Sequence, residues 1–348
     1  MGLAVPVSIM VGSGRGADLG LLFRRGEAVH RLASAPVVAF DTTGTLTEGR
    51  PLLVAMTTEG MVEDEALRLM ASAEARSEHP LAAAILEAAS SRKLPLADAT
   101  DVSTQAGRGL QAKVDGRHLL IGNLAALSDA GIDASPDLVS AAEQMAEQGA
   151  TPVHLAVDGR HTASLALADT PRPEAAATID SLHRMGVRTV MLSGDVVPAA
   201  QAVGRQLGID RIEAGLSPAE KLSAIAQMGE GTVFVGDGIN DAPALAAART
   251  GIAIGTGTDV AIETADAVLM SGDTMGVVRA LRLSRAVMRN SRQNLFWAFA
   301  YNTALIPVAM GVLVPFGGPA LSPMLGAAAM ALSSVCVIGN ALRLRRAG

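Results

Sequence analysis

Two short acidic segments, each placed directly after an apolar run, contain the residue types that phosphoryl transfer needs. Asp41 follows Pro36–Phe40, and a carboxylate in this position can attack a γ-phosphate and hold it as an aspartyl-phosphate. Asp237 and Asp241 follow Val233–Val235 and offer the oxygen ligands that Mg²⁺ prefers. The pattern predicts a carboxylate nucleophile beside a magnesium site.

Two further segments supply the other groups that such a site uses. Lys221 is one of only three lysines in a chain that otherwise uses arginine, and its ammonium group can neutralise a phosphate. Ser193-Gly194-Asp195 follows the apolar run Val190–Leu192 and offers a hydroxyl together with the N–H groups of a turn. Each segment alone is commonly a turn or a solvated helix start, but the four together favour catalysis.

The elements that must position these residues are strands alternating with helices. We expect strands at 36–40, 188–192, 211–214, 232–235 and 251–254, with helical segments between the later ones. This alternation is typical of a doubly wound parallel sheet, where chemistry takes place at the carboxyl ends of the strands. Asp41 and Asp237 then lie side by side if their strands are neighbours.

Residues 52–165 interrupt this pattern and read as an inserted α+β domain. Asp115-Gly116 and Asp158-Gly159 each separate two apolar segments, which predicts two hairpins. The predicted organisation is therefore a discontinuous α/β domain, residues 35–51 plus 166–275, around the insertion.

The last part of the chain is apolar enough to enter a membrane. Residues 294–315 and 321–342 are each long enough to span a bilayer, and a linker helix at 276–293 precedes them. Arginines at both outer ends predict a hairpin whose ends, and the catalytic domains, are in the cytoplasm of a multi-pass plasma-membrane protein. The net charge of −6 argues against nucleic acid as a partner, and the single cysteine, Cys336, excludes a disulfide within the chain.

These segments carry a resemblance to a known family. Residues 41–47, Asp-Thr-Thr-Gly-Thr-Leu-Thr, resemble the phosphorylation signature Asp-Lys-Thr-Gly-Thr-Leu-Thr of P-type ATPases, with Thr42 in the position of the family's lysine. Together with Ser193-Gly194-Asp195, Lys221 and the 236–241 segment Gly-Asp-Gly-Ile-Asn-Asp, they are similar to the haloacid dehalogenase-like phosphorylation domain of that family. The resemblance implies that Asp41 is phosphorylated and that Lys221 and Asn240 contact the phosphate. It implies a Mg²⁺ site at Asp41, the Thr43 carbonyl and Asp237, to which we add Asp241.

The insertion resembles the nucleotide-binding domain of heavy-metal-pumping P-type ATPases. Residues 77–81, Ser-Glu-His-Pro-Leu, match the signature of that group. The resemblance implies that ATP is held by a set of five residues: Glu74, His79, Gly107, Gly109 and Asn123. No Gly-x4-Gly-Lys-[Ser/Thr] sequence is present, which excludes a P-loop NTPase.

The predicted membrane hairpin resembles that of the copper-transporting branch. Tyr301 and Asn302 in the first span, and Met330 and Ser334 in the second, match positions that the resemblance assigns to the transported metal. A methionine thioether suits a soft ion, so the resemblance implies Cu(I) or Ag(I). Helix–helix packing is the alternative role of such residues.

The resemblance covers the rear half of such a pump. Gly2–Pro6 is similar to the segment that follows a Cys-Pro-Cys motif, and residues 1–34 read as the end of a membrane helix and a linker. We expect this chain alone not to pump ions and to need a complementary chain that carries the other helices and an actuator domain. Thr42 is expected to slow phosphorylation, because it removes a positive charge beside Asp41.

Two other functions are compatible with the residues. A haloacid dehalogenase-like phosphatase would need an acid two residues after the nucleophile, where this chain has Thr43. A non-transporting ATP-binding or regulatory descendant of a pump is compatible with Thr42 and with the absent segments.

Overall fold

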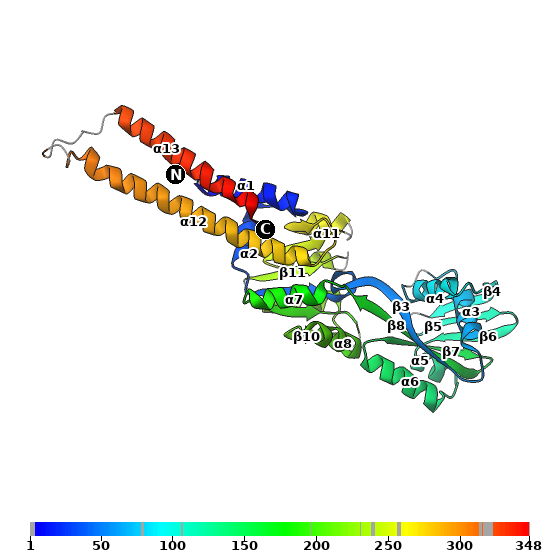
Figure 1. The fold of residues 1–348 in the computed structure, drawn as a ribbon. Helices are drawn as coiled ribbons and strands as arrows, with labels where there is room; N and C mark the ends of the chain where they lie inside the picture. The colour runs from blue at the N-terminus through cyan, green and yellow to red at the C-terminus, as the bar shows by residue number, and fades with distance from the viewer. Residues whose placement is uncertain are drawn as a thin grey trace. The chain divides into compact units, whose positions relative to one another are not determined.

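The structure is a computed structural model that describes residues 4–77, 80–105, 107–195, 197–229, 231–237, 241–255, 259–312, 315 and 323–347 (Figure 1). Contacts within the chain divide it into two compact units. One unit comprises residues 1–40, 177–189 and 218–348, and the other comprises residues 41–176 and 190–217.

A seven-stranded sheet carries the acidic segments. Its order is β1-β13-β12-β11-β2-β9-β10, and the pairs β2–β11, β11–β12, β12–β13 and β9–β10 are parallel, whereas β1 is antiparallel to β13. The strands are β1 (Leu21–Phe23), β2 (Val37–Asp41), β9 (Arg188–Leu192), β10 (Arg211–Glu213), β11 (Thr232–Gly236), β12 (Thr250–Ile254) and β13 (Ala267–Leu269).

Helices alternate with these strands along the chain, as predicted. They are α2 (Gly26–Ala33), α7 (Ala175–Arg184), α8 (Val197–Leu207), α9 (Pro218–Gln227), α10 (Ala242–Ala247) and α11 (Asp259–Thr264). Every residue of β2, β11 and β12 is buried, which explains why these strands read as continuous apolar runs. The predicted α/β architecture with a parallel sheet is confirmed.

The inserted segment forms a six-stranded antiparallel sheet in the order β3-β8-β7-β6-β5-β4. Its elements are β3 (Thr47–Thr58), α3 (Glu63–Glu74), α4 (Pro80–Ser91), β4 (Ala99–Gln105), β5 (Gly109–Val114), β6 (Arg117–Gly122), α5 (Leu124–Asp129), α6 (Pro136–Glu147), β7 (Thr151–Val157) and β8 (Arg160–Pro171). Side chains of α3 and α4, among them Leu67, Met70 and Ile85, pack against the sheet in one apolar cluster.

Both predicted hairpins are present in this sheet. The central residues Asp115 and Gly116 have φ of 50° and 77°, and Asp158 and Gly159 have φ of 48° and 78°. Two successive positive φ angles are what a two-residue hairpin turn requires, and Asp-Gly adopts them readily. The predicted boundaries at 51/52 and 165/166 fall within β3 and β8, and the domain limits stay a prediction.

Three long helices complete the chain: α1 (Ala4–Asp18), α12 (Met275–Ala309) and α13 (Pro323–Leu342), which the 3₁₀ segment η4 (Arg343–Arg346) follows. Val277, Val278 and Leu281 near the start of α12 are buried, whereas Phe296 and Trp297 further along are exposed. Within the described residues, one helical stretch, Gly326–Arg346, is long and apolar enough to cross a membrane. The predicted two-span topology therefore stays a prediction.

Candidate active site

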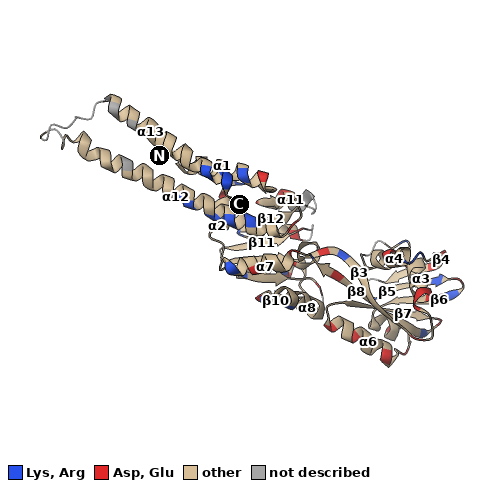
Figure 2. Cartoon of the chain, in the orientation of Figure 1, with Lys and Arg blue, Asp and Glu red and all other residues tan. Residues whose placement is uncertain are grey.

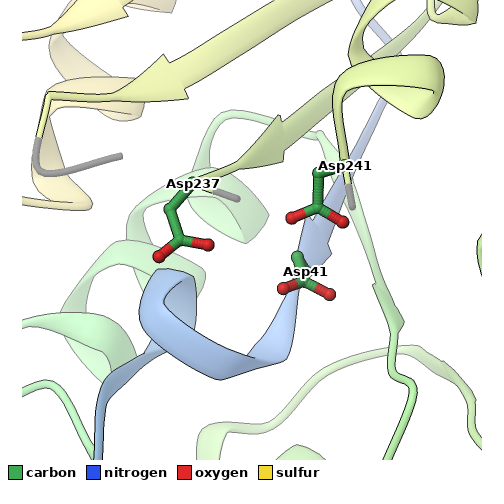
Figure 3. A group of neighbouring side chains, drawn as sticks. All are labelled: Asp41, Asp237 and Asp241. Atoms are coloured by element: carbon green, nitrogen blue, oxygen red, sulfur yellow. The ribbon is translucent and has the colours of Figure 1, made fainter. Parts of the chain in front are cut away.

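The site forms where β2 and β11 end side by side. Phe40 pairs with Val235 in the parallel register, so Asp41 and Asp237 leave the sheet at the same edge. Figure 3 shows Asp41, Asp237 and Asp241 facing a common space, and one carboxylate oxygen from each lies within 4.8 Å of the others. The register of two strands that are almost 200 residues apart in sequence thus assembles a three-carboxylate cluster.

This cluster concentrates negative charge in a largely buried place. Asp41 is 6% exposed and Asp241 is 2% exposed. Lys221, from the first turn of α9, lies with Nζ 3.2 Å from Asp241 Oδ1 and is itself buried. Three carboxylates against one ammonium leave an excess of negative charge, which a divalent cation can offset.

The donor set fits Mg²⁺. Magnesium binds carboxylate oxygens at about 2.0–2.1 Å, so opposite ligands of one ion lie about 4 Å apart. The spacing of the three carboxylate oxygens, within 4.8 Å, accommodates such an ion after small side-chain adjustments. The hard, oxygen-only character of the set favours magnesium over a soft metal.

Gly236 leaves room for one of these carboxylates. A Cβ at this position would lie 2.8 Å from Asp241 Oδ2 and 2.9 Å from Asp241 Cβ. The glycine before Asp237 is therefore required by the close packing of Asp241, in addition to ending the strand. Gly238 to Asn240 lie outside the described residues, so the predicted role of Asn240 stays a prediction.

The loop after Asp41 is held by hydrogen bonds among its own residues and by Arg172. Gly44 has φ of 76°, which glycine adopts without strain. Thr47 Oγ1 accepts a hydrogen bond from Gly44 N at 3.3 Å and lies 3.0 Å from Thr42 O. Arg172 donates to Thr45 O at 3.0 Å and to Gly44 O at 2.8 Å.

Asp169, near the end of β8, reinforces the same loop. Its carboxylate accepts from Gly49 N and Arg50 N, both at 3.1 Å, and lies 2.5 Å from Thr47 Oγ1. Burial raises the pKa of Asp169 above its ordinary value, although these hydrogen bonds act in the opposite direction. Asp169 and Arg172 were not among the predicted site residues. The feature that could have indicated them is the polar segment Asp-Thr-Pro-Arg, residues 169–172, directly after an apolar run.

Ser193, Asp195 and Thr43 are joined by hydrogen bonds. Ser193 Oγ donates to Asp195 Oδ2 at 3.0 Å and accepts from Asp195 N at 3.0 Å. Thr43 Oγ1 donates to Asp195 Oδ2 at 3.4 Å. The turn that contains Gly194 therefore orients an acid against the loop that follows Asp41.

Among the described residues, the side chain of Thr42 makes no hydrogen bond to the site, and it brings no charge. It is 3% exposed, and its Oγ1 has no hydrogen-bond partner within the described part of the chain. A buried, unpaired hydroxyl usually reduces stability, because its desolvation is not compensated.

Three of the five predicted nucleotide-site residues lie together. Asn123 Nδ2 donates to Gly107 O at 3.0 Å, and Asn123 Oδ1 caps α5 by accepting from Ala126 N. Gly109 has φ of 148°, and a Cβ there would lie 2.0 Å from Ile121 O. Glu74 ends α3, and His79 lies outside the described residues.

The four predicted metal-transport residues lie on α12 and α13. Asn302 Nδ2 donates to Ala298 O at 2.6 Å, and Ser334 Oγ donates to Met330 O at 3.2 Å, so each polar side chain bonds its own helix. Met330 is 71% exposed. The side chain of Tyr301 lies outside the described part, and no hydrogen bond between described residues joins Asn302 to Ser334.

Comparisons with known proteins agree with this geometry. Residues 35–249 match the family of haloacid dehalogenase-like hydrolases. A copper-transporting ATPase of Rhizobium meliloti is 52% identical over 99% of this chain, and a copper-exporting P-type ATPase of Legionella pneumophila is 46% identical over 99%. The chain spans 42% and 47% of the lengths of these two relatives.

Solved structures with the same fold include a zinc-transporting PIB-type ATPase in its E2.Pi state. It superposes with a TM-score of 0.84 at 35% identity, and the match covers 98% of this chain and 55% of that one. The catalytic domain of a CPx-ATPase, CopB-B, superposes with a TM-score of 0.62 at 25% identity, over 78% of this chain and 98% of that one.

Proposed function

The chain belongs to the haloacid dehalogenase-like hydrolase family and is related over almost its whole length to heavy-metal P-type ATPases, and from that premise we propose that it hydrolyses ATP through an aspartyl-phosphate at Asp41. The observation that carries the proposal is the cluster of Asp41, Asp237 and Asp241 beside the buried ammonium of Lys221.

In the proposed reaction, a carboxylate oxygen of Asp41 attacks the γ-phosphorus of ATP. The bond between that phosphorus and the β,γ-bridging oxygen breaks, ADP leaves, and the phosphoryl group becomes an acyl phosphate on Asp41. Water then hydrolyses the acyl phosphate to inorganic phosphate and restores the carboxylate. Lys221 stabilises negative charge on the transferring group, and the Ser193–Asp195 turn orients the loop that carries Thr43.

Asp41 and Asp237, with the Thr43 carbonyl and Asp241, are the proposed holders of Mg²⁺. When bound, the ion neutralises charge on the phosphate and orients it for in-line attack. The protein's own contribution is a largely buried acidic cluster whose shape depends on Gly236. Asn240 is proposed to contact the phosphate as well.

ATP is proposed to bind the six-stranded sheet through Glu74, His79, Gly107, Gly109 and Asn123. The hydrogen bond between Asn123 and Gly107 supports this assignment, because it brings Asn123 next to the turn that precedes β5. Glycine in this turn, at Gly107, and at the first residue of β5, Gly109, lets a nucleotide approach the backbone closely.

Transport of a soft metal, Cu(I) or Ag(I), is proposed for the membrane helices. It is supported by relatives that carry the name of copper transporters and by the thioether of Met330 on an apolar helix. We propose that transport also needs a metal-entry motif and a dephosphorylation loop supplied by other sequence. Copper uptake by vesicles that contain this polypeptide alone would refute that requirement.

A phosphatase function is less well supported. Thr43 stands where a hydrolytic general acid would be needed, and its hydroxyl is bonded to Asp195. The aspartyl-phosphate is therefore expected to persist long enough to be trapped.

The test is incorporation of ³²P from [γ-³²P]ATP into the purified chain. We expect an acid-stable, hydroxylamine-labile product that requires Mg²⁺ and is lost in Asp41→Asn. Asp133→Asn, which changes an exposed acid of the six-stranded sheet unit, is the matched control and should label normally. Labelling that survives Asp41→Asn would overturn the assignment.

A further inference from the structure

The carboxy-terminal part of the chain has an extreme charge composition. Residues 275–348 contain no aspartate or glutamate, whereas the whole chain carries a net charge of −6. The same stretch contains these arginines: Arg279, Arg282, Arg285, Arg289, Arg292, Arg343, Arg345 and Arg346. Figure 2 colours basic positions blue on the ribbon of α12 near α1, and no acidic position is coloured on α12. Because this stretch has no acidic side chain, the positive charges of its arginines can be offset only by groups outside it.

Three of these arginines have protein partners within the described residues. Arg279 pairs with Asp273 at 2.8 Å, and Arg285 donates to Met185 O at 3.1 Å. Arg343 donates to Asn340 Oδ1 at 3.4 Å but remains exposed. Six arginines are exposed and form no ion pair within the described part of the chain; we call them the arginine collar: Arg282, Arg289, Arg292, Arg343, Arg345 and Arg346. On α12 the collar residues are spaced by seven and three positions, which places them on one side of the helix.

A buried polar network holds the collar arginines of α12 and η4 at the same level. Asn290 Nδ2 donates to Asn340 O at 2.8 Å, and Asn340 Nδ2 donates to Asn294 Oδ1 at 2.9 Å. Ser8 of α1 joins them by donating to Asn290 Oδ1 at 2.9 Å. Arg289 and Arg292 are close to Asn290 in sequence, and Arg343 follows Asn340 by about one helical turn, so the network joins the backbone segments that carry these arginines at one junction of three helices.

The two helices change character beyond this junction. Phe296 and Trp297 on α12 are each 64% exposed, and Val335 on α13 is 65% exposed. Arginines before the junction, and an exposed tryptophan and apolar side chains beyond it, form the pattern expected at a boundary between lipid headgroups and hydrocarbon.

We propose that the arginine collar binds the phosphodiester headgroups of anionic phospholipids at the cytoplasmic surface of the membrane. This inference rests on the membrane location in the proposed function. Guanidinium groups bind phosphate through paired, charge-assisted hydrogen bonds, and an exposed collar is open to several headgroups at once. A single soluble anion would instead be expected in a buried cradle, whereas the collar arginines are exposed on two elements, α12 and η4, that adjoin apolar surface.

The chain supplies its own probe for this proposal. Trp297 is its only tryptophan and lies little more than one helical turn beyond Arg292. The full chain is reconstituted in nanodiscs of phosphatidylcholine with a minor fraction of phosphatidylglycerol, and either lipid is brominated so that it quenches Trp297. We expect stronger quenching by the brominated anionic lipid, with a preference of about fivefold for each engaged arginine.

Substitutions and changes in salt concentration test whether the arginines cause the preference for the anionic lipid. Arg289→Gln with Arg292→Gln should reduce it, Arg160→Gln in the six-stranded sheet should leave it unchanged, and raising salt from about 0.1 M to about 1 M should weaken it. Equal quenching by the two lipids overturns the collar proposal. Loss of the preference on adding inorganic phosphate at constant ionic strength assigns the collar to a soluble anion and also overturns it. Absence of quenching by either lipid indicates that α12 is not in lipid, which contradicts the membrane location itself.

Discussion

Lys221 Nζ lies 3.2 Å from Asp241 Oδ1, and the two side chains are 10% and 3% exposed. The pair therefore stabilises a carboxylate that has little access to water. Its ammonium is at the same time the cation that the proposed phosphoryl transfer needs, so one residue serves the fold and the chemistry.

Replacing Lys221 by methionine should reduce both the stability of the fold and the rate of phosphorylation. Asp241 would remain buried without its partner, and breaking a buried pair on one side costs about 3–5 kcal/mol. We expect a lower free energy of unfolding in urea and a loss of aspartyl-phosphate. Lys93→Met changes an exposed lysine and should alter neither quantity; if Lys221→Met labels as well as this control, Lys221 has no role in the reaction.

Gly236→Ala should disturb the acidic cluster without changing any charge. The new methyl group would lie 2.8 Å from Asp241 Oδ2, so the carboxylate must move. We expect the Mg²⁺ concentration needed for half-maximal phosphorylation to rise by about tenfold or more, since magnesium demands near-ideal geometry.

Gly14→Ala in α1 is the control for Gly236→Ala, because no atom lies within 4 Å of the Cβ it would add. An unchanged Mg²⁺ dependence in Gly236→Ala would mean that Asp241 does not take part in the metal site.

Thr42→Lys should raise the rate of phosphorylation. An ammonium beside Asp41 offsets charge on the transferring phosphate, and the loss of one such contact typically costs on the order of 10²-fold in rate. Rapid-quench measurement of the ³²P-labelled intermediate gives the comparison.

Thr42→Val separates charge from packing. Valine has nearly the shape of threonine and removes an unpaired buried hydroxyl, so it should leave stability unchanged or raise it by about 1 kcal/mol. It should not accelerate phosphorylation. If Thr42→Val and Thr42→Lys phosphorylate at the same rate, the missing charge is not the cause of slow reaction.

The six-stranded sheet should lose stability in acid because of a buried histidine pair. His154 Nδ1 lies 3.2 Å from His161 Nε2 and 2.8 Å from Ser164 Oγ, and Ser135 N donates to His161 Nδ1. Burial, together with the neighbouring His161, lowers the pKa of His154 to about 4 from 6.5, and burial also lowers the pKa of His161.

The direction in which stability changes with pH follows from these pKa shifts. Between pH 6.5 and about 4 the unfolded His154 binds a proton that the folded one does not, so stability is complete above pH 6.5 and falls as pH decreases through this range. The loss from His154 is on the order of 3 kcal/mol. Hydrogen exchange of β7 and β8, corrected for its intrinsic pH dependence, should show it. His154→Gln should flatten the profile, and His118→Gln, at an exposed site in the same sheet, should not.

Much of the site was predictable because its residues end buried strands. Asp41 and Asp237 follow continuous apolar runs, and the register of β2 with β11 then brings them together. Asp169 and Arg172 were not predicted, because their contacts depend on pairing between β3 and β8, whose residues are more than a hundred positions apart. The burial of Thr42 could not be predicted either, because the sequence does not indicate which side chains of a loop face inward.

The pairing of Thr47 with Pro171 has a consequence for how such chains diversify. It brings the point where the chain enters the six-stranded sheet next to the point where it leaves. A module whose two ends are neighbours can be exchanged, enlarged or deleted as a cassette while the remaining chain keeps its path. If this sheet binds the nucleotide, as proposed, its preference can evolve by replacement of residues between these two points, under rules separate from those that govern the acidic cluster.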